Sequence, residues 1–182
     1  GGIGRAITEG LLERGVKRVI LACRNEDKCL RMIESMGECR DALEFMRLDL
    51  GSFASVRRFA ESCALRGMTV AALFNNAGTM PGGVKMTEDG FESATQTNFL
   101  STGLLTELLL PLMPRHASIV FTTSMTRRIV NLCEDWRQRS VERHGRFTTY
   151  GRSKLMLTHY ALDLSGRLAK QEITVNLSLR HI

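Results

Sequence analysis

Two residues that could exchange protons stand one helical turn apart in the last third of the chain. Tyr150 and Lys154 are four positions apart, and the apolar residues after them recur at helical spacing. Positions i and i+4 share one face of a helix, so the phenol and the ammonium can meet. A neighbouring cation favours the phenolate and lowers a phenol pKa that is otherwise about 10, which makes the phenol a usable general acid–base. The pair alone is weak evidence, because this spacing also occurs by chance on helix surfaces.

The sequence also indicates which elements would hold these residues. Short β-rich runs alternate with helical stretches, which predicts βαβ units and a parallel sheet. We expect strands over residues 17–22, 43–48, 69–74, 117–123 and 173–178. We expect helices over residues 4–14, 26–36, 53–66, 91–113 and 148–169, with Ser52 and Gly67 capping the third and a potential break near Thr95. The predicted fold class is therefore α/β, a Rossmann-like doubly wound parallel sheet in a single domain over residues 1–182.

Residues 126–147 do not fit this alternation. They are dense in charge and are punctuated by turn-favouring residues such as Asn131 and Gly145. A long insertion between a strand and a helix of an α/β fold lies beyond the carboxyl end of the strand, where ligands bind. Two interpretations stay open: a flap over a substrate, or a solvated excursion from the body of the domain.

Five features follow one another along the chain in an order typical of one family. They are a glycine turn at residues 1–4, the run Asn75-Asn76-Ala77-Gly78, Asn98, Ser124 and the Tyr150–Lys154 pair. This series resembles the short-chain dehydrogenase/reductase family over nearly the whole chain. Residues 21–25, 98–106 and 150–155 look like its retinol-dehydrogenase-like branch. The resemblance implies the α/β fold above and hydride transfer between a nicotinamide cofactor and a carbonyl or alcohol substrate.

The resemblance implies catalytic roles for four residues. Tyr150 would donate a proton to a carbonyl or take one from an alcohol, and Lys154 would assist it and hold the nicotinamide ribose. Ser124 would hydrogen-bond the substrate oxygen, and Asn98 would anchor a water that relays protons to Lys154. These residue types suit the chemistry, because hydride arriving at a carbonyl carbon builds negative charge on oxygen that preorganised donors stabilise. Taken singly, Ser124 could equally cap a strand end and Asn98 a helix.

Residues near the start of the chain are implied to bind the cofactor. Gly2, Ile3 and Gly4 fit the end of a glycine-rich turn, where the backbone approaches a pyrophosphate and a helix N-terminus points at it. In a dinucleotide fold, an acidic residue after the second strand holds the ribose 2′-hydroxyl, whereas an arginine suits a 2′-phosphate. The strand over 17–22 corresponds to that second strand, and Arg24 follows it, with Asn25 next. The sequence therefore favours NADP(H) over NAD(H).

The other implied cofactor residues follow two later strands. Asp49 and Leu50 come after the strand over 43–48, where Asp49 would contact the adenine amino group or cap the next helix. Asn75, Ala77 and Gly78 come after the strand over 69–74. By resemblance, these three let the backbone lie against the cofactor and stabilise the sheet.

Composition limits the other classes of partner. Hydrophobic residues make up 43% of the chain and charged residues 24%, which is ordinary for a globular domain. The net charge of +6 comes from scattered arginines without interleaved aromatic residues, so we expect no nucleic-acid partner. The 5 cysteines show no metal-ligand spacing, which favours free thiols in a reducing, cytoplasmic compartment and no metal site.

The two ends of the chain determine which hypotheses stay open. The chain begins with Gly rather than Met, so we expect further residues upstream, where a targeting or anchor segment could lie; no apolar run here is long enough to span a bilayer. The first strand of the fold, expected at the centre of the sheet, and the C-terminal substrate-lid region are absent from the sequence. One hypothesis is an oxidoreductase seen in part, acting on a hydrophobic retinoid-, steroid- or ketone-like substrate and forming a homodimer, as members of the family often do. The other is a truncated, non-catalytic remnant that acts as a binding or interaction protein.

Overall fold

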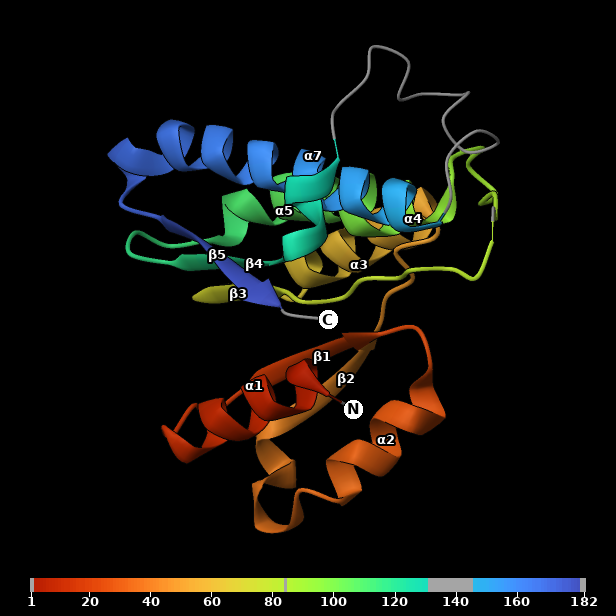
Figure 1. Ribbon diagram of the computed structural model, residues 1–182. Helices are drawn as coiled ribbons and strands as arrows, with labels where there is room; N and C mark the ends of the chain where they lie inside the picture. Colours follow the sequence, from red (N-terminus) through yellow and green to blue (C-terminus); the bar gives the residue numbers. More distant parts are fainter. Residues whose placement is uncertain (1, 84, 131–145, 181–182) are drawn as a thin grey trace. The chain divides into compact units, whose positions relative to one another are not determined.

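A computed structural model describes residues 2–83, 85–130 and 146–180 of the chain. These residues form two compact units, Gly1–Asp49 and Leu50–Ile182. Each unit contains parallel strands with helices beside them (Figure 1), which confirms the predicted α/β class. Most of the predicted flap, residues 131–145, lies outside the described residues.

The first unit is built around a two-stranded parallel sheet. Its strands are β1 (Val19–Cys23) and β2 (Leu43–Arg47), paired from Val19 opposite Leu43 to Cys23 opposite Arg47. Helices α1 (Ile3–Glu13) and α2 (Glu26–Glu34) lie alongside the sheet, and a 3₁₀ turn, Gly37–Ala42, leads into β2 (Figure 1). Helix α2 begins where Asn25 Oδ1 accepts a hydrogen bond from Lys28 N at 2.8 Å, which is a normal N-cap.

The second unit is built around a three-stranded parallel sheet. Its strands are β3 (Ala72–Asn75), β4 (Ser118–Ser124) and β5 (Thr174–Arg180), with β4 in the middle. Its helices are α3 (Phe53–Leu65), α4 (Ser93–Thr95), α5 (Ser101–Leu109) and α7 (Arg146–Leu168). Single 3₁₀ turns are found at Leu110–Leu112, Met125–Ile129 and Ala169–Gln171. The helices lie over one face of the sheet in Figure 1, where α7 contacts β4 and β5.

The core of the second unit lies between β4 and α7. Ile119 and Phe121 of β4 are fully buried, and α7 packs Leu157, Leu164 and Leu168 in the same cluster. The spacing of these leucines gives α7 one apolar face, as the sequence predicted. Burying each of these large side chains contributes about 1.5–3 kcal/mol to stability. This packing sets the register of α7 on the sheet, and hence the position of every other residue of the helix.

Helix α3 has both of the caps that its sequence predicts. At its start, Ser52 Oγ accepts a hydrogen bond from Ser55 N at 3.4 Å. Gly67 follows its end with a φ of 58°, in the left-handed region that glycine adopts without steric cost. The helix therefore ends within a residue of the predicted position.

In the predicted helix over residues 91–113, the α-helical hydrogen-bonding pattern changes after Thr95, near the potential break that the sequence indicated, while the backbone stays helical. A π-helical turn, Gln96–Leu100, separates α4 from α5, and the amide that follows the turn bonds to the Gln96 carbonyl five residues back. Such turns are rare and occur often at functional sites. This one carries Asn98, a predicted catalytic residue.

The strand pattern predicts one sheet, whereas the described residues form two, β1-β2 and β3-β4-β5. No described strand pairs with members of both groups. Strand β3 also starts later than predicted. Val70 N donates to Leu112 O at 2.9 Å, so this residue pairs with a turn rather than with a strand.

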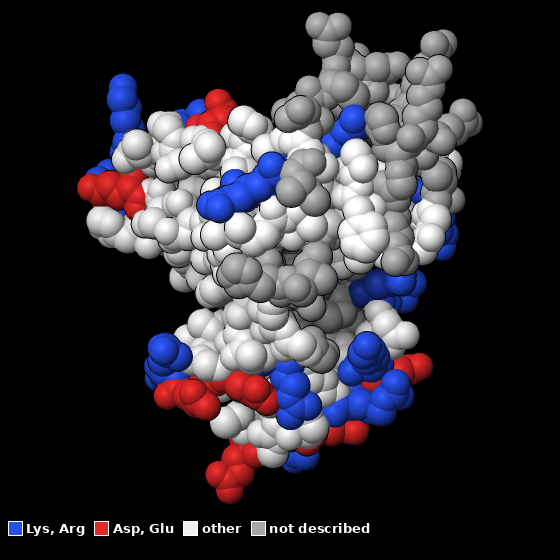
Figure 2. Space-filling model, in the orientation of Figure 1, with Lys and Arg blue, Asp and Glu red and all other residues white. Residues whose placement is uncertain are grey.

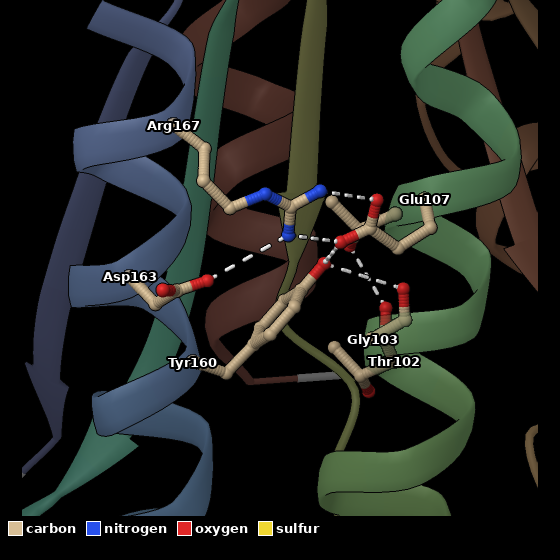
Figure 3. Close-up of polar contacts among 7 residues, drawn as sticks. Thr102, Gly103, Glu107, Tyr160, Asp163 and Arg167 are labelled. Carbon is tan, nitrogen blue, oxygen red and sulfur yellow. Dashed lines mark hydrogen bonds and ion pairs between the residues drawn. The ribbon is translucent and has the colours of Figure 1, made fainter.

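A polar cluster ties α5 to α7 at the edge of the core (Figure 3). Arg167 donates to both carboxylate oxygens of Glu107, from Nη1 at 2.7 Å and from Nη2 at 3.0 Å, and the Tyr160 hydroxyl donates to Glu107 Oε1 at 3.0 Å. The hydrogen bonds from Arg167 hold the pKa of Glu107 below its usual range. Burial, with Glu107 close by, raises the pKa of the Tyr160 phenol well above its usual range.

Charges of both signs are interspersed on the visible face of the first unit (Figure 2). Within this unit, Arg18 and Glu44 form an ion pair at 2.8 Å. No described helix combines the length and apolar character needed to cross a membrane. Within the described part of the chain, histidine, cysteine and acidic side chains do not gather into a group of three that could hold a metal ion.

Candidate active site

The four predicted catalytic residues all belong to the second unit, and all are buried. Ser124 is the last residue of β4, Asn98 lies in the π-helical turn, and Tyr150 and Lys154 lie on α7. Asn98 and Ser124 are 0% exposed, Lys154 is 2% exposed and Tyr150 is 8% exposed. Burying a polar group costs free energy unless it is hydrogen-bonded, so each of these residues needs a partner or a function.

Lys154 lies close to Tyr150, as the spacing of four residues predicts. The Lys154 Nζ is 5.9 Å from the centroid of the Tyr150 ring. Its ammonium donates a hydrogen bond to Thr122 O at 2.8 Å, near the end of β4. A buried ammonium is costly without such an acceptor. The strand carbonyl therefore holds the cation beside the phenol.

Asn98 is held in one orientation by three hydrogen bonds. Its Oδ1 accepts from Thr79 N at 2.7 Å, and its Nδ2 donates to Thr79 O at 2.9 Å and to Ser153 Oγ at 2.9 Å. Ser153 Oγ in turn donates to Tyr150 O at 2.7 Å. Asn98 is thus linked through one hydroxyl to the turn of α7 that carries Tyr150.

Gly78 lies where Asn98 and Lys154 meet. A Cβ on this residue would lie 3.2 Å from Lys154 Nζ and 3.3 Å from Asn98 Oδ1. Both distances are tighter than ordinary van der Waals contact, so the backbone approaches the two side chains as closely as glycine allows. Asn75, at the end of β3, donates from Nδ2 to Thr106 Oγ1 at 3.1 Å and thereby joins the strand to α5.

Ser124 is held by the turn that follows it. Its Oγ accepts hydrogen bonds from Thr126 Oγ1 at 3.0 Å and from Thr126 N at 3.3 Å. The same turn packs against α7 beside Tyr150, because a Cβ on Gly151 would lie 2.9 Å from Thr126 O and 2.9 Å from Val130 Cγ1. The turn after Ser124 and the helix after Tyr150 are therefore in close contact.

The cofactor residues predicted near the start of the chain belong to the first unit. Gly2 has a φ of 64° and precedes α1, whose first turn has no side-chain cap. Amides at an uncapped helix N-terminus suit a phosphate group, so this end of α1 fits the predicted pyrophosphate site. Arg24 is exposed just after β1, and Asn25 caps α2. Asp49 ends the first unit, directly after the strand residues of β2 and Leu48.

Comparison with known proteins identifies the family. The model of the short chain dehydrogenase family matches residues 1–179. The chain belongs to the short-chain dehydrogenase family. It is 32% identical to human polyprenol dehydrogenase over 97% of this chain and 56% of that protein. It is 33% identical to mouse retinol dehydrogenase 13 over 96% of this chain and 53% of that protein, which confirms the resemblance to retinol dehydrogenases.

A solved structure supports the fold of this short-chain dehydrogenase. The RhlG/NADP active-site complex of Pseudomonas aeruginosa matches it with a TM-score of 0.74 and 27% identity, covering 97% of this chain and 66% of that one. The chain spans about half the length of the curated relatives it matches.

Several contacts of this short-chain dehydrogenase are missed by sequence reasoning. Thr79, Thr126 and Ser153 hydrogen-bond to the predicted catalytic residues, and Gly151 packs closely against Thr126. Two signals were available: Ser153 directly precedes Lys154, and Gly151 directly follows Tyr150. Thr79 directly follows Gly78, and Thr126 stands two positions after Ser124, but neither threonine belongs to a motif of its own.

Proposed function

We propose that this chain carries the catalytic and cofactor-binding part of an oxidoreductase that transfers hydride between NADP(H) and a hydrophobic carbonyl or alcohol substrate. One observation carries the proposal. Lys154, 2% exposed, lies beside Tyr150 and, with Asn98, closes around Gly78. A buried cation costs free energy even when it is hydrogen-bonded, and a buried ionisable group beside a second titratable side chain is typical of a functional site.

Each residue has a task that its position allows. When bound, the nicotinamide supplies or accepts the hydride. Tyr150 gives a proton to the substrate oxygen or takes one from it, and Lys154 stabilises the phenolate that this exchange creates. Ser124 donates a hydrogen bond to the same oxygen, where negative charge develops. Asn98, fixed by Thr79 and Ser153, would anchor a water that relays protons to Lys154.

The cofactor assignment rests on residues of this chain. The amides at the start of α1, around Gly2, Ile3 and Gly4, would hold the pyrophosphate. The Arg24 guanidinium would pair with a ribose 2′-phosphate, which favours NADP(H) over NAD(H). Asp49 and the backbone at Gly78 complete the proposed set. The similarity to the RhlG/NADP complex supports the same choice.

The relatives support a hydrophobic substrate. Polyprenol dehydrogenase and retinol dehydrogenase 13 are named for long, apolar alcohols. A related site in this chain would take an apolar aldehyde, ketone or alcohol and reserve its polar contacts for one oxygen. Met125 and Thr126, directly after Ser124, are our candidates for lining this site.

Nucleotide binding tests the cofactor proposal directly. The 182-residue chain is titrated with NADPH and NADH while nucleotide fluorescence is followed. We expect saturable NADPH binding that Arg24→Asp weakens by about ten-fold or more. Arg58→Asp makes the same change of charge at an exposed position on α3 and should leave binding unchanged. Equal weakening by both variants would mean that net charge, and not Arg24, governs affinity.

The catalytic site is tested by a second matched pair. Gly78→Ala places a methyl 3.2 Å from Lys154 Nζ and should lower kcat for reduction of an apolar aldehyde by about ten-fold or more. Nothing lies within 4 Å of a Cβ on Gly82, so Gly82→Ala should keep full activity. If Gly78→Ala is as active as Gly82→Ala, the arrangement around Gly78 is not the active site.

A second candidate function is that of a non-catalytic binding protein. The two separate sheets favour it, because unpaired strand edges readily pair with another chain. The nucleotide titration distinguishes the two candidates. A folded chain that binds neither nucleotide would support the binding protein and exclude the oxidoreductase for this chain.

If the oxidoreductase is correct, we further propose a homodimer through the helix of Tyr150, which size-exclusion chromatography with light scattering would detect.

A further inference from the structure

Two hydrogen bonds from Thr126 leave the Ser124 hydroxyl able to donate a hydrogen bond but not to accept another. Ser124 Oγ accepts from Thr126 Oγ1 at 3.0 Å and from Thr126 N at 3.3 Å. A serine hydroxyl has two acceptor lone pairs and one proton to donate. Both lone pairs are therefore engaged, while no described residue accepts the Ser124 proton.

Thr126 is itself held from the side of α7. Its carbonyl oxygen would lie 2.9 Å from a Cβ on Gly151, so its backbone packs directly against the residue after Tyr150. Thr126 therefore contacts Ser124 through hydrogen bonds and Gly151, the residue after Tyr150, through packing.

We propose that Thr126 is a positioning residue that makes Ser124 a dedicated hydrogen-bond donor to the substrate oxygen. This inference rests on the proposed function. A carbonyl or alkoxide oxygen can accept the Ser124 proton. An alcohol O–H, by contrast, finds no open lone pair on Ser124 and must give its proton to Tyr150. Thr126 thereby separates the two tasks, hydrogen-bond donation by Ser124 and proton exchange by Tyr150.

Three variants of the 182-residue chain test this assignment with NADPH and an aliphatic aldehyde, nonanal, as probes. Thr126→Val removes the hydroxyl and keeps the shape, and should lower kcat by about ten-fold while NADPH affinity stays unchanged. Thr126→Ser keeps the hydroxyl and should restore most of the activity. Thr69→Val, at an exposed threonine, is the control and should behave as wild type. Wild-type kcat in Thr126→Val, or equal loss in Thr126→Ser, overturns the proposal.

A measurement without turnover separates this inference from the proposed function. Melting temperatures of Ser124→Ala, Thr126→Val and the double variant form a double-mutant cycle. If the two side chains bond to each other, the double variant shifts by less than the sum of the single shifts, and additive shifts overturn the proposal. If wild type binds NADPH but reduces no aldehyde or ketone, the proposed function fails, and the cycle alone then supports or overturns the hydrogen-bonded arrangement.

Discussion

Two glycines of α7 offer a matched test of how closely this helix approaches the turn after Ser124. A Cβ on Gly151 would lie 2.9 Å from Thr126 O and 2.9 Å from Val130 Cγ1, whereas nothing lies within 4 Å of a Cβ on Gly166. Alanine at either position adds the same methyl group to the same helix. The two variants therefore differ in what that methyl meets.

The size of the difference follows from two opposing effects. Alanine in place of glycine stabilises a helix interior by about 1 kcal/mol, so Gly166→Ala should raise the free energy of unfolding by that amount. Gly151→Ala gains the same amount but must displace a backbone carbonyl and the Val130 side chain, and overpacking of this kind costs about 1–3 kcal/mol. Because the helix preference cancels in the comparison, Gly151→Ala should be less stable than Gly166→Ala by about 1–3 kcal/mol.

Urea unfolding followed by far-UV circular dichroism measures this difference, since the midpoint and the slope together give the free energy of unfolding. Turnover of an apolar aldehyde provides a second measurement. Displacing Thr126 also displaces Ser124, so Gly151→Ala should lower kcat, and Gly166→Ala should not. Two variants with equal stability would refute the close approach of α7 to this turn.

The remaining predictions concern titratable groups. Hydrogen bonds from Arg167 hold the pKa of Glu107 below its ordinary value of 4.5. The difference in unfolding free energy between wild type and Glu107→Gln should therefore be constant above pH 4.5 and shrink as the pH falls through the lowered pKa of the folded state. Urea unfolding across this range measures the difference, and a difference that does not change with pH would contradict the ion pair. Burial raises the pKa of Tyr160 above its ordinary value of 10.0, so wild type should be fully stabilised below pH 10 and lose stability as the pH rises further, a loss that Tyr160→Phe should reduce. Burial, with Cys23 nearby, raises the pKa of the Cys29 thiol to about 12, so brief alkylation and mass spectrometry should find Cys29 unmodified until the chain unfolds.

Elements with a strong side-chain period could be predicted from the sequence. Strand β4 and helix α7 begin within two residues of their predicted starts, 117 and 148. Leu157, Leu164 and Leu168 are all buried, so the periodic pattern seen in the sequence is the pattern of burial itself. The positions of Tyr150 and Lys154 follow, because both residues lie on this helix.

The π-helical turn could not be predicted in this way, because its extra residue is a main-chain feature with no period of its own. The contacts of Asn98 raise a different difficulty. Its partners Thr79 and Ser153 stand 19 and 55 positions away, and hydrogen bonds of this kind depend on the final packing of three elements. The sequence can name the residue types that such a contact needs, but which hydroxyl meets which amide is settled only when the chain has folded.

The contacts around Lys154 show how the fold and the site depend on one another. Removing an ion from water costs roughly several kcal/mol even after the protein relaxes, yet Lys154 is only 2% exposed. The Thr122 carbonyl offsets part of this cost, and the buried leucines of α7 stabilise the packing that holds the helix, and Lys154 with it, against the sheet. A weaker core would let α7 shift on the sheet, which would hydrate the cation and move Tyr150 and Lys154 together relative to Ser124 on β4. The packing of β4 against α7 is therefore what keeps an unfavourable charge where proton transfer requires it.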